Sequence, residues 1–212
     1  MAAASFRRKG GEGTVNEFGN MLLYLLIMAT MQNLVLTAGF GSSTLVHMMR
    51  RQRYRRAYAQ LLLVFTVATT ALFYPIDQSL PYGWQFRMLR PLIVVALTAL
   101  LYIVTVVVAI RRYAVWYRRV RRLLPLAAFN NIVVGAALIT NYQLSVSFFP
   151  AIGIAAGAAL GFILVSALSA EAMERMDNPD TPAAFRGLPG MLVYLGLFAL
   201  ALMGFDSMLN LI

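Results

Sequence analysis

The sequence contains six apolar runs, each long enough to cross the roughly 30 Å of bilayer hydrocarbon as an α-helix. Short polar or basic connections separate them, and 60% of the 212 residues are hydrophobic while only 12% are charged. Soluble domains carry about 25% charged residues, so too few polar side chains remain here to cover a soluble globule. The sequence therefore predicts an all-α polytopic membrane protein with transmembrane helices near residues 20–46, 57–76, 88–110, 123–141, 148–170 and 188–210.

The start of the chain is polar and differs from the remainder. It carries a basic triplet, and the apolar run that begins at Met21 has no small-residue cleavage site typical of a secretory signal. We therefore expect a flexible extension over residues 1–19 and a single six-helix transmembrane domain over residues 20–212.

The basic residues are distributed unevenly along the chain. Most of the 18 Lys and Arg residues lie after runs one, three and five, mainly in the arginine-rich segments 50–56 and 111–122. Because such residues are retained on the cytoplasmic side, we expect these segments in the cytoplasm and both termini outside it. The net charge of +10 is then a topological signal that favours contact with lipid headgroups over nucleic acid.

Several kinds of reactive site are absent from the sequence. It has no cysteine, so it supplies no disulfide, cysteine nucleophile, thiolate-bound zinc or thiolate-held iron–sulfur cluster. His47, the one histidine, is interpreted as an interfacial side chain, because no second ligand type accompanies it. All eight carboxylates fall in expected loops or near span ends, so an ion path would use amides, hydroxyls and backbone carbonyls. No phosphate loop or nucleophile elbow supports catalysis of the soluble type.

An internal repeat relates the two halves of the chain. Segment 31–38 aligns with segment 129–136, since each has an amide pair, three apolar residues and then a small residue. The halves 20–110 and 123–210 would each contain three spans. An odd number of spans per half makes the two copies face opposite ways, so the pattern predicts two inverted three-helix repeats.

The two amide pairs lie inside apolar runs, where an uncompensated polar group costs several kcal/mol. Glycine and hydroxyl residues follow the first pair, and a glycine follows the second, so we expect helices 1 and 4 to be interrupted near the midplane. The interruptions would expose a polar path to a ligand, ion or partner. Interhelical hydrogen bonding with close packing of small residues is the alternative. The path would be lined by Gln32, Asn33, Asn130, Asn131 and Gly135.

Three groups of residues carry a resemblance to a known family. The first is Asn33-Leu34-Val35-Leu36 followed by Gly41; the second is Leu124-Pro125-Leu126 followed by Asn130 and Val133-Val134-Gly135. The third is Glu174-Arg175-Met176, then Pro182 to Gly187, and Met203-Gly204-Phe205. In order and spacing these resemble the Rnf/Nqr family of integral membrane subunits, most closely the A-type subunits of Rnf (Rsx) complexes and their NqrE counterparts.

The resemblance implies a cofactor, partners and a location. In that family an A-type subunit pairs with an oppositely oriented E-type or D-type homologue in the bacterial inner (plasma) membrane, beside further Rnf/Nqr subunits. Each of the pair contributes two cysteines to one [2Fe–2S] cluster, which passes electrons in a reaction coupled to sodium or proton movement. By motif the two cysteine positions correspond to Ser43 and Asn131 here, so the resemblance implies no cofactor held by this chain alone.

The sequence supports one leading hypothesis and two alternatives. The first is a non-catalytic membrane subunit of an Rnf/Nqr-type ion-translocating electron-transport complex, serving as a scaffold or path element without its own [2Fe–2S] ligands. The alternatives are a transporter or channel for a small solute or cation that reuses the inverted-repeat fold, and a purely structural membrane subunit. Substitution of the amide pairs would alter flux in a transporter and only assembly or stability in a structural protein.

Overall fold

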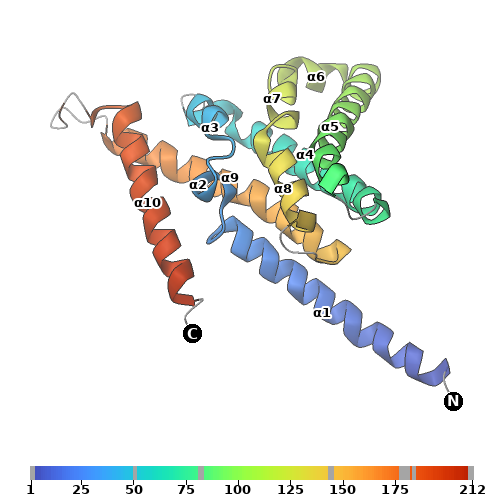
Figure 1. Ribbon diagram of the computed structural model, residues 1–212. Helices are drawn as coiled ribbons and strands as arrows, with labels where there is room; N and C mark the ends of the chain where they lie inside the picture. Colours follow the sequence, from blue (N-terminus) through green and yellow to red (C-terminus); the bar gives the residue numbers. More distant parts are fainter. Residues whose placement is uncertain are drawn as a thin grey trace.

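A computed structural model describes residues 3–49, 52–80, 84–142, 146–176, 182 and 185–209, and every regular element in these residues is a helix. The α-helices are α1 Ala3–Ala29, α2 Leu34–Thr37, α3 Ser42–Met49, α4 Gln52–Ser79, α5 Trp84–Arg112, α6 Ala114–Val120, α7 Leu124–Ala128, α8 Asn131–Tyr142, α9 Phe148–Met176 and α10 Leu188–Leu209 (Figure 1). The all-helical prediction is thus confirmed for the described residues.

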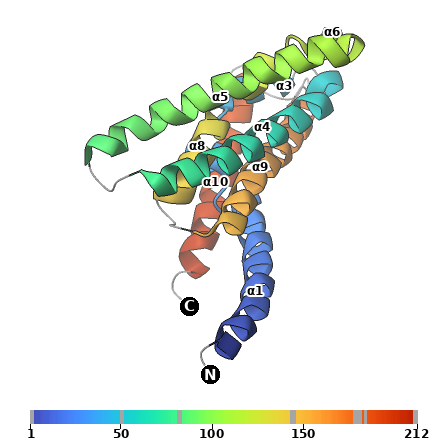
Figure 2. The ribbon, with the colours of Figure 1, turned by 90° about the vertical axis from the view of Figure 1, so that its right-hand side faces the viewer.

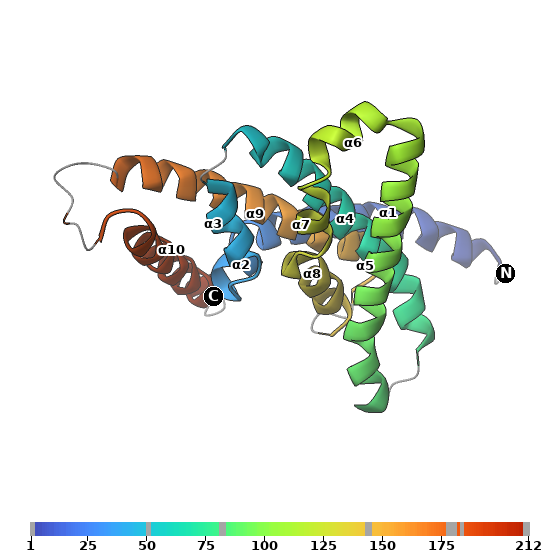
Figure 3. The same cartoon turned by 90° about the horizontal axis from the view of Figure 1, so that it is seen from above.

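Helices α4 and α9 pack against each other in the middle of the bundle (Figure 2). Helix α1 packs along α9, while α7 and α8 pack against α4. Helix α5 covers one side through α4 and α8, and α10 covers the other through α9 and α2 (Figure 3). The amino-terminal end of α1 extends beyond the other helices, as Figures 1 and 2 both show.

Glycines make the contact between α1 and α9 unusually close. Gly153, Gly157 and Gly161 recur every fourth residue of α9 and so lie on one face of the helix. A Cβ atom at Gly157 would lie only 2.5 Å from the backbone oxygen of Leu25 in α1. The spacing of these glycines is the G-x-x-x-G pattern, which in membrane helices indicates a face that packs closely on a neighbouring helix.

Length and hydropathy identify helices that can cross a membrane. Within the described residues three qualify, at Tyr54–Ser79, Met88–Arg112 and Phe148–Arg175, and they coincide with the second, third and fifth predicted runs. A fourth is obtained if Ala114–Val120 and Leu124–Thr140, bent by 69°, count as one broken span, while the apolar part of α10 is shorter. The six-helix inverted repeat therefore stays a prediction.

Several helices extend beyond the predicted ends of the runs. Helix α4 continues through Pro75 to Ser79. Proline lacks only its own N–H donor to the preceding turn, and the residues after it can still donate to theirs. The expected loop over 111–122 contains α6, and α9 continues past the predicted end at residue 170 into the expected loop, as far as Met176. These segments are rich in Arg, Ala, Met and Glu, which all favour helix, and their charged residues lower the hydropathy that marked the predicted runs. Helix α1 already begins at Ala3, within the expected extension, and the boundary at residue 20 stays a prediction.

Candidate functional site: two interrupted helices

The first predicted run is interrupted after α1, at Asn33. The Asn33 side chain is only 1% exposed. Its Oδ1 accepts a hydrogen bond from the backbone N–H of Val35 at 3.0 Å, and its Nδ2 donates to the backbone oxygen of Ala29 at 3.1 Å. One side chain thereby caps the start of α2 and binds the end of α1, which satisfies backbone groups that the break would otherwise leave unpaired.

A second turn separates α2 from α3 and depends on glycine. Gly39 and Gly41 have φ of 68° and 74°, in the left-handed region that other residues rarely adopt. Between them, the backbone N–H of Phe40 donates to the oxygen of Leu34 at 3.0 Å, which closes the short helix α2. The interruption expected in the first predicted span is therefore present as two adjacent turns, one between α1 and α2 and one between α2 and α3.

The second interruption lies between α7 and α8, at Asn130, which is 3% exposed. Asn130 Oδ1 accepts from the backbone N–H of Ile132 at 3.0 Å, the same relation that Asn33 has to the residue two positions after it. Its Nδ2 donates to the hydroxyl oxygen of Tyr58 at 2.6 Å, and that hydroxyl donates to the backbone oxygen of Leu126 at 3.3 Å. Tyr58 on α4 thus connects both sides of the break.

The fold brings the two interruptions into direct contact. A Cβ atom at Gly41 would lie 2.8 Å from Ile132 Cδ1 and 3.0 Å from Asn130 Oδ1. Reciprocally, the ring of Phe40 fills the space where a Gly135 side chain would stand. The turn between α2 and α3 therefore packs on the start of α8 with no room for larger side chains.

The predicted site residues divide into two groups. Asn33, Asn130 and Gly135 are buried, and both buried amides are bonded within the chain. The exposed residues are Gln32, Ser43 and Asn131. Ser43 and Asn131 lie within two residues of the Gly41–Asn130 contact and so flank the place where the interruptions meet. Whether the predicted residues line a path stays a prediction.

Tyr58, which is fully buried, is a site residue that the sequence did not indicate. Its ring lies 5.5 Å from that of Phe162 on α9, and its hydroxyl is the side-chain partner of Asn130. No sequence signal marks it, because it follows a basic segment at the predicted start of the second span. For His47, the structure places the backbone in α3, and its side chain lies outside the described part of the molecule.

Comparison with protein families matches residues 21–209 to the Rnf-Nqr subunit family of membrane proteins. The chain belongs to this family. It is similar to the A-type subunit of the ion-translocating oxidoreductase complex of Actinobacillus pleuropneumoniae serotype 5b, with 32% identity over 147 residues, 69% of this chain and 75% of that protein. The protein of the same description from Syntrophotalea carbinolica is 28% identical over 189 residues, 89% of this chain and 97% of that one. That of Alcanivorax borkumensis is 40% identical over 95 residues, 45% of this chain and 49% of that one.

The donor atoms of this Rnf-Nqr chain do not match a thiolate-held [2Fe–2S] cluster. Its sequence contains no cysteine, and the positions that the resemblance assigns to cluster ligands hold the hydroxyl of Ser43 and the amide of Asn131. Neutral hydroxyl and amide oxygens are hard, weak donors for iron that thiolates otherwise hold. Within the described residues there is also no group of three His, Asp or Glu side chains that could replace them.

A buried ion pair lies in the Rnf-Nqr chain away from the interruptions. Arg90 Nε on α5 lies 2.8 Å from Asp77 Oδ1 in the last turn of α4, and both side chains are less than 10% exposed. Asp77 was expected near the end of a span, and the structure adds that it is paired with a cation. The pair fixes the start of α5 against the end of α4, where the connection between them begins.

Proposed function

We propose that this chain is a membrane component of an Rnf-type ion-translocating oxidoreductase complex, in which it acts as a scaffold without [2Fe–2S] ligands of its own. The similar proteins are described as A-type components of such complexes. The observation that carries the proposal is the contact between the two interruptions, beside which Ser43 and Asn131 stand exposed.

The proposal includes six transmembrane helices in two inverted repeats. If the two halves exchange places, span 1 takes the place of span 4 and span 5 takes the place of span 2. Helix α1 belongs to span 1, α4 to span 2, α7 and α8 to span 4, and α9 to span 5. The contacts follow this exchange, because α1 packs on α9 while α7 and α8 pack on α4. The central contact joins α4 and α9, which exchange with each other, so the same contact is obtained again. This pattern supports a two-fold axis in the membrane plane. The uneven distribution of Lys and Arg supports both termini outside the cytoplasm and the arginine-rich segments inside.

A scaffold role is favoured over a polar path by the bonding of the buried amides. Both polar atoms of Asn33 and of Asn130 have partners in this chain at 2.6–3.1 Å. An amide that coordinated a permeating ion would also need its oxygen exposed to the path, whereas Asn33 and Asn130 are only 1% and 3% exposed. These side chains instead satisfy the backbone at the breaks, which in a membrane is itself worth several kcal/mol. The exposed Ser43 and Asn131 would then face a partner protein of the complex.

Co-purification tests the proposed complex. The tagged full-length chain, extracted from native membranes in mild detergent, is expected to elute with an oppositely oriented membrane homologue and with other Rnf-type subunits. Elution as a stable monomer, with no such partner, would contradict the proposal.

Iron content of the purified complex tests the absence of cluster ligands. Ser43→Ala and Asn131→Ala should leave iron and visible absorbance unchanged, as should Ser42→Ala, an exposed neighbour that serves as the control. If either site variant but not the control lost iron, this chain would hold a cofactor through those positions and the scaffold role would be wrong.

A further inference from the structure

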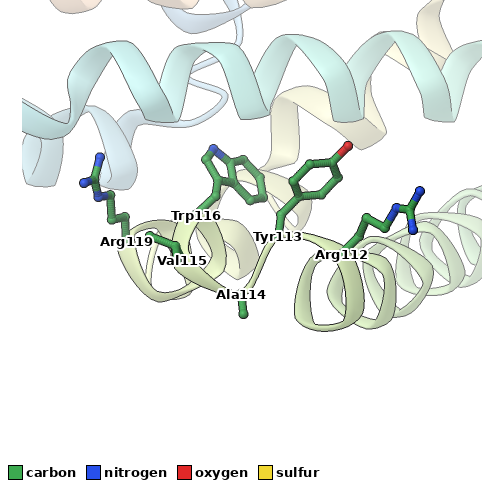
Figure 4. A pocket seen from close by; sticks show the side chains of 6 residues that line it. All are labelled: Arg112, Tyr113, Ala114, Val115, Trp116 and Arg119. Atoms are coloured by element: carbon green, nitrogen blue, oxygen red, sulfur yellow. The ribbon is translucent and has the colours of Figure 1, made fainter.

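The corner between α5 and α6 forms an open hollow of about 420 Å³. It is lined by Arg112, Tyr113, Ala114, Val115, Trp116 and Arg119. In Figure 4 the two aromatic rings stand between the two arginine side chains, and all four project to the same side of the corner while Ala114 points away. The hollow therefore combines two cations with two aromatic rings that stand between them.

The charge of this corner is not balanced within the described chain. Four more arginines lie nearby, at positions 111, 118, 121 and 122, while the sequence has no carboxylate between Asp77 and Glu171. The ion pairs among described residues join Arg90 to Asp77 and Arg175 to Glu171, so the corner arginines have no carboxylate partner there. An anion from outside the chain is the complementary ligand.

The position of the corner indicates which anion is at hand. The outer face of α5 is apolar and exposed up to Ile110, which is 50% exposed, and the arginines begin at the next residue. Tyr113 and Trp116 follow, 61% and 44% exposed. Tyr and Trp of membrane proteins gather at the level of the lipid headgroups, and arginine there extends toward the phosphates. If α5 spans the bilayer, the hollow lies among lipid phosphates.

We propose that this hollow binds the headgroup phosphodiester of an anionic glycerophospholipid such as phosphatidylglycerol. The guanidinium groups of Arg112 and Arg119 donate charge-assisted hydrogen bonds to the phosphate oxygens, for which their planar fork is suited. The rings of Tyr113 and Trp116 pack against the glycerol backbone beneath it. The site does not depend on the role of the chain in a complex.

A pair of double variants with equal loss of charge tests the site. The full-length chain in detergent is titrated with phosphatidylglycerol, and bound lipid is measured by native mass spectrometry. Arg112→Gln/Arg119→Gln should weaken binding about tenfold more than Arg121→Gln/Arg122→Gln, because only the first pair lines the hollow. Equal weakening by both variants, or equally tight binding of phosphatidylcholine, would overturn the proposal.

A second measurement needs no change in the hollow. In a Trp84→Phe background the only tryptophan is Trp116. Phosphatidylglycerol brominated near the headgroup end of its acyl chains should quench its fluorescence, both in the isolated chain and in the purified complex, more than the matching brominated phosphatidylcholine. Loss of this quenching when millimolar inorganic phosphate is added would show that the hollow binds the free anion. Quenching that is present in the isolated chain but absent in the complex would show that another protein covers the corner. Each of these two results would overturn the proposed lipid site.

Discussion

Replacement of Gly41 by alanine should destabilise the protein more than the same change at Gly39, although both residues have positive φ. An alanine in the left-handed region costs about 1–2 kcal/mol, and this cost applies at both positions. Only Gly41 faces the second interruption, where the new Cβ would lie 2.8 Å from Ile132 Cδ1. At Gly39 nothing lies within 4 Å. The difference between the two variants therefore measures the contact between the interruptions.

The additional cost at Gly41 follows from what must move. The Asn130 amide, 3.0 Å from the new atom, is held by Ile132 N–H and by Tyr58, and loss of such buried hydrogen bonds costs about 1–3 kcal/mol. We thus expect a loss of about 1–2 kcal/mol for Gly39→Ala and about 2–5 kcal/mol for Gly41→Ala.

Reversible unfolding in mixed micelles, followed by tryptophan fluorescence, supplies these free energies. Ile132→Val removes the Cδ1 atom that the new Cβ would meet, so it should relieve part of the Gly41→Ala penalty in a double-mutant cycle, with a coupling of about 0.5–1 kcal/mol. Equal losses at Gly39 and Gly41, together with additive behaviour in the cycle, would refute the contact between the interruptions.

Three further variants test other parts of the fold by the same unfolding measurement. Gly157→Ala should cost about 1–3 kcal/mol, because its Cβ would meet the α1 backbone at 2.5 Å, whereas Gly196→Ala in α10 meets nothing and should gain up to about 1 kcal/mol; equal effects would contradict the close α1–α9 packing. Asp77→Leu or Arg90→Leu alone should lower the free energy of unfolding by about 3–5 kcal/mol, and the double variant should lower it much less. Additive losses in the double variant would contradict a buried ion pair. Tyr58→Phe should cost about 1–3 kcal/mol and increase hydrogen exchange at the α7–α8 junction, and unchanged exchange would show that its hydroxyl is dispensable.

The interruptions of the first and fourth predicted spans could be predicted because polar amides inside apolar runs need local partners. Which amide of each pair performs the capping could not be predicted. In the pair Gln32–Asn33 the later residue, Asn33, is the cap, whereas in the pair Asn130–Asn131 the cap is the earlier residue, Asn130. The other two residues, Gln32 and Asn131, are exposed. Capping depends on where the helix breaks to within one residue, whereas the pattern of apolar residues locates a break only to within a turn.

Long-range partners were the other part that the sequence did not reveal. Tyr58 meets Asn130 across 72 positions, and Arg90 meets Asp77 across the connection between two helices. A single sequence contains the periodicity of each helix but not the rotation of one helix against another. The exposed arginines of α6 were predicted as a cytoplasmic loop, since hydropathy does not distinguish a polar helix from a polar loop.

The hydrogen bonds of the two capping asparagines also bear on how the chain is made. The partners of Asn33 are Ala29 and Val35, four residues before it and two after it, so the first break can satisfy itself as soon as it leaves the ribosome. Asn130 needs Tyr58, which was synthesised 72 residues earlier. Neither break has to wait in lipid for a hydrogen-bonding partner that has not yet been translated. Synthesis from the amino to the carboxyl end therefore makes a partner for each of these two amides available close to the time when the amide itself is made.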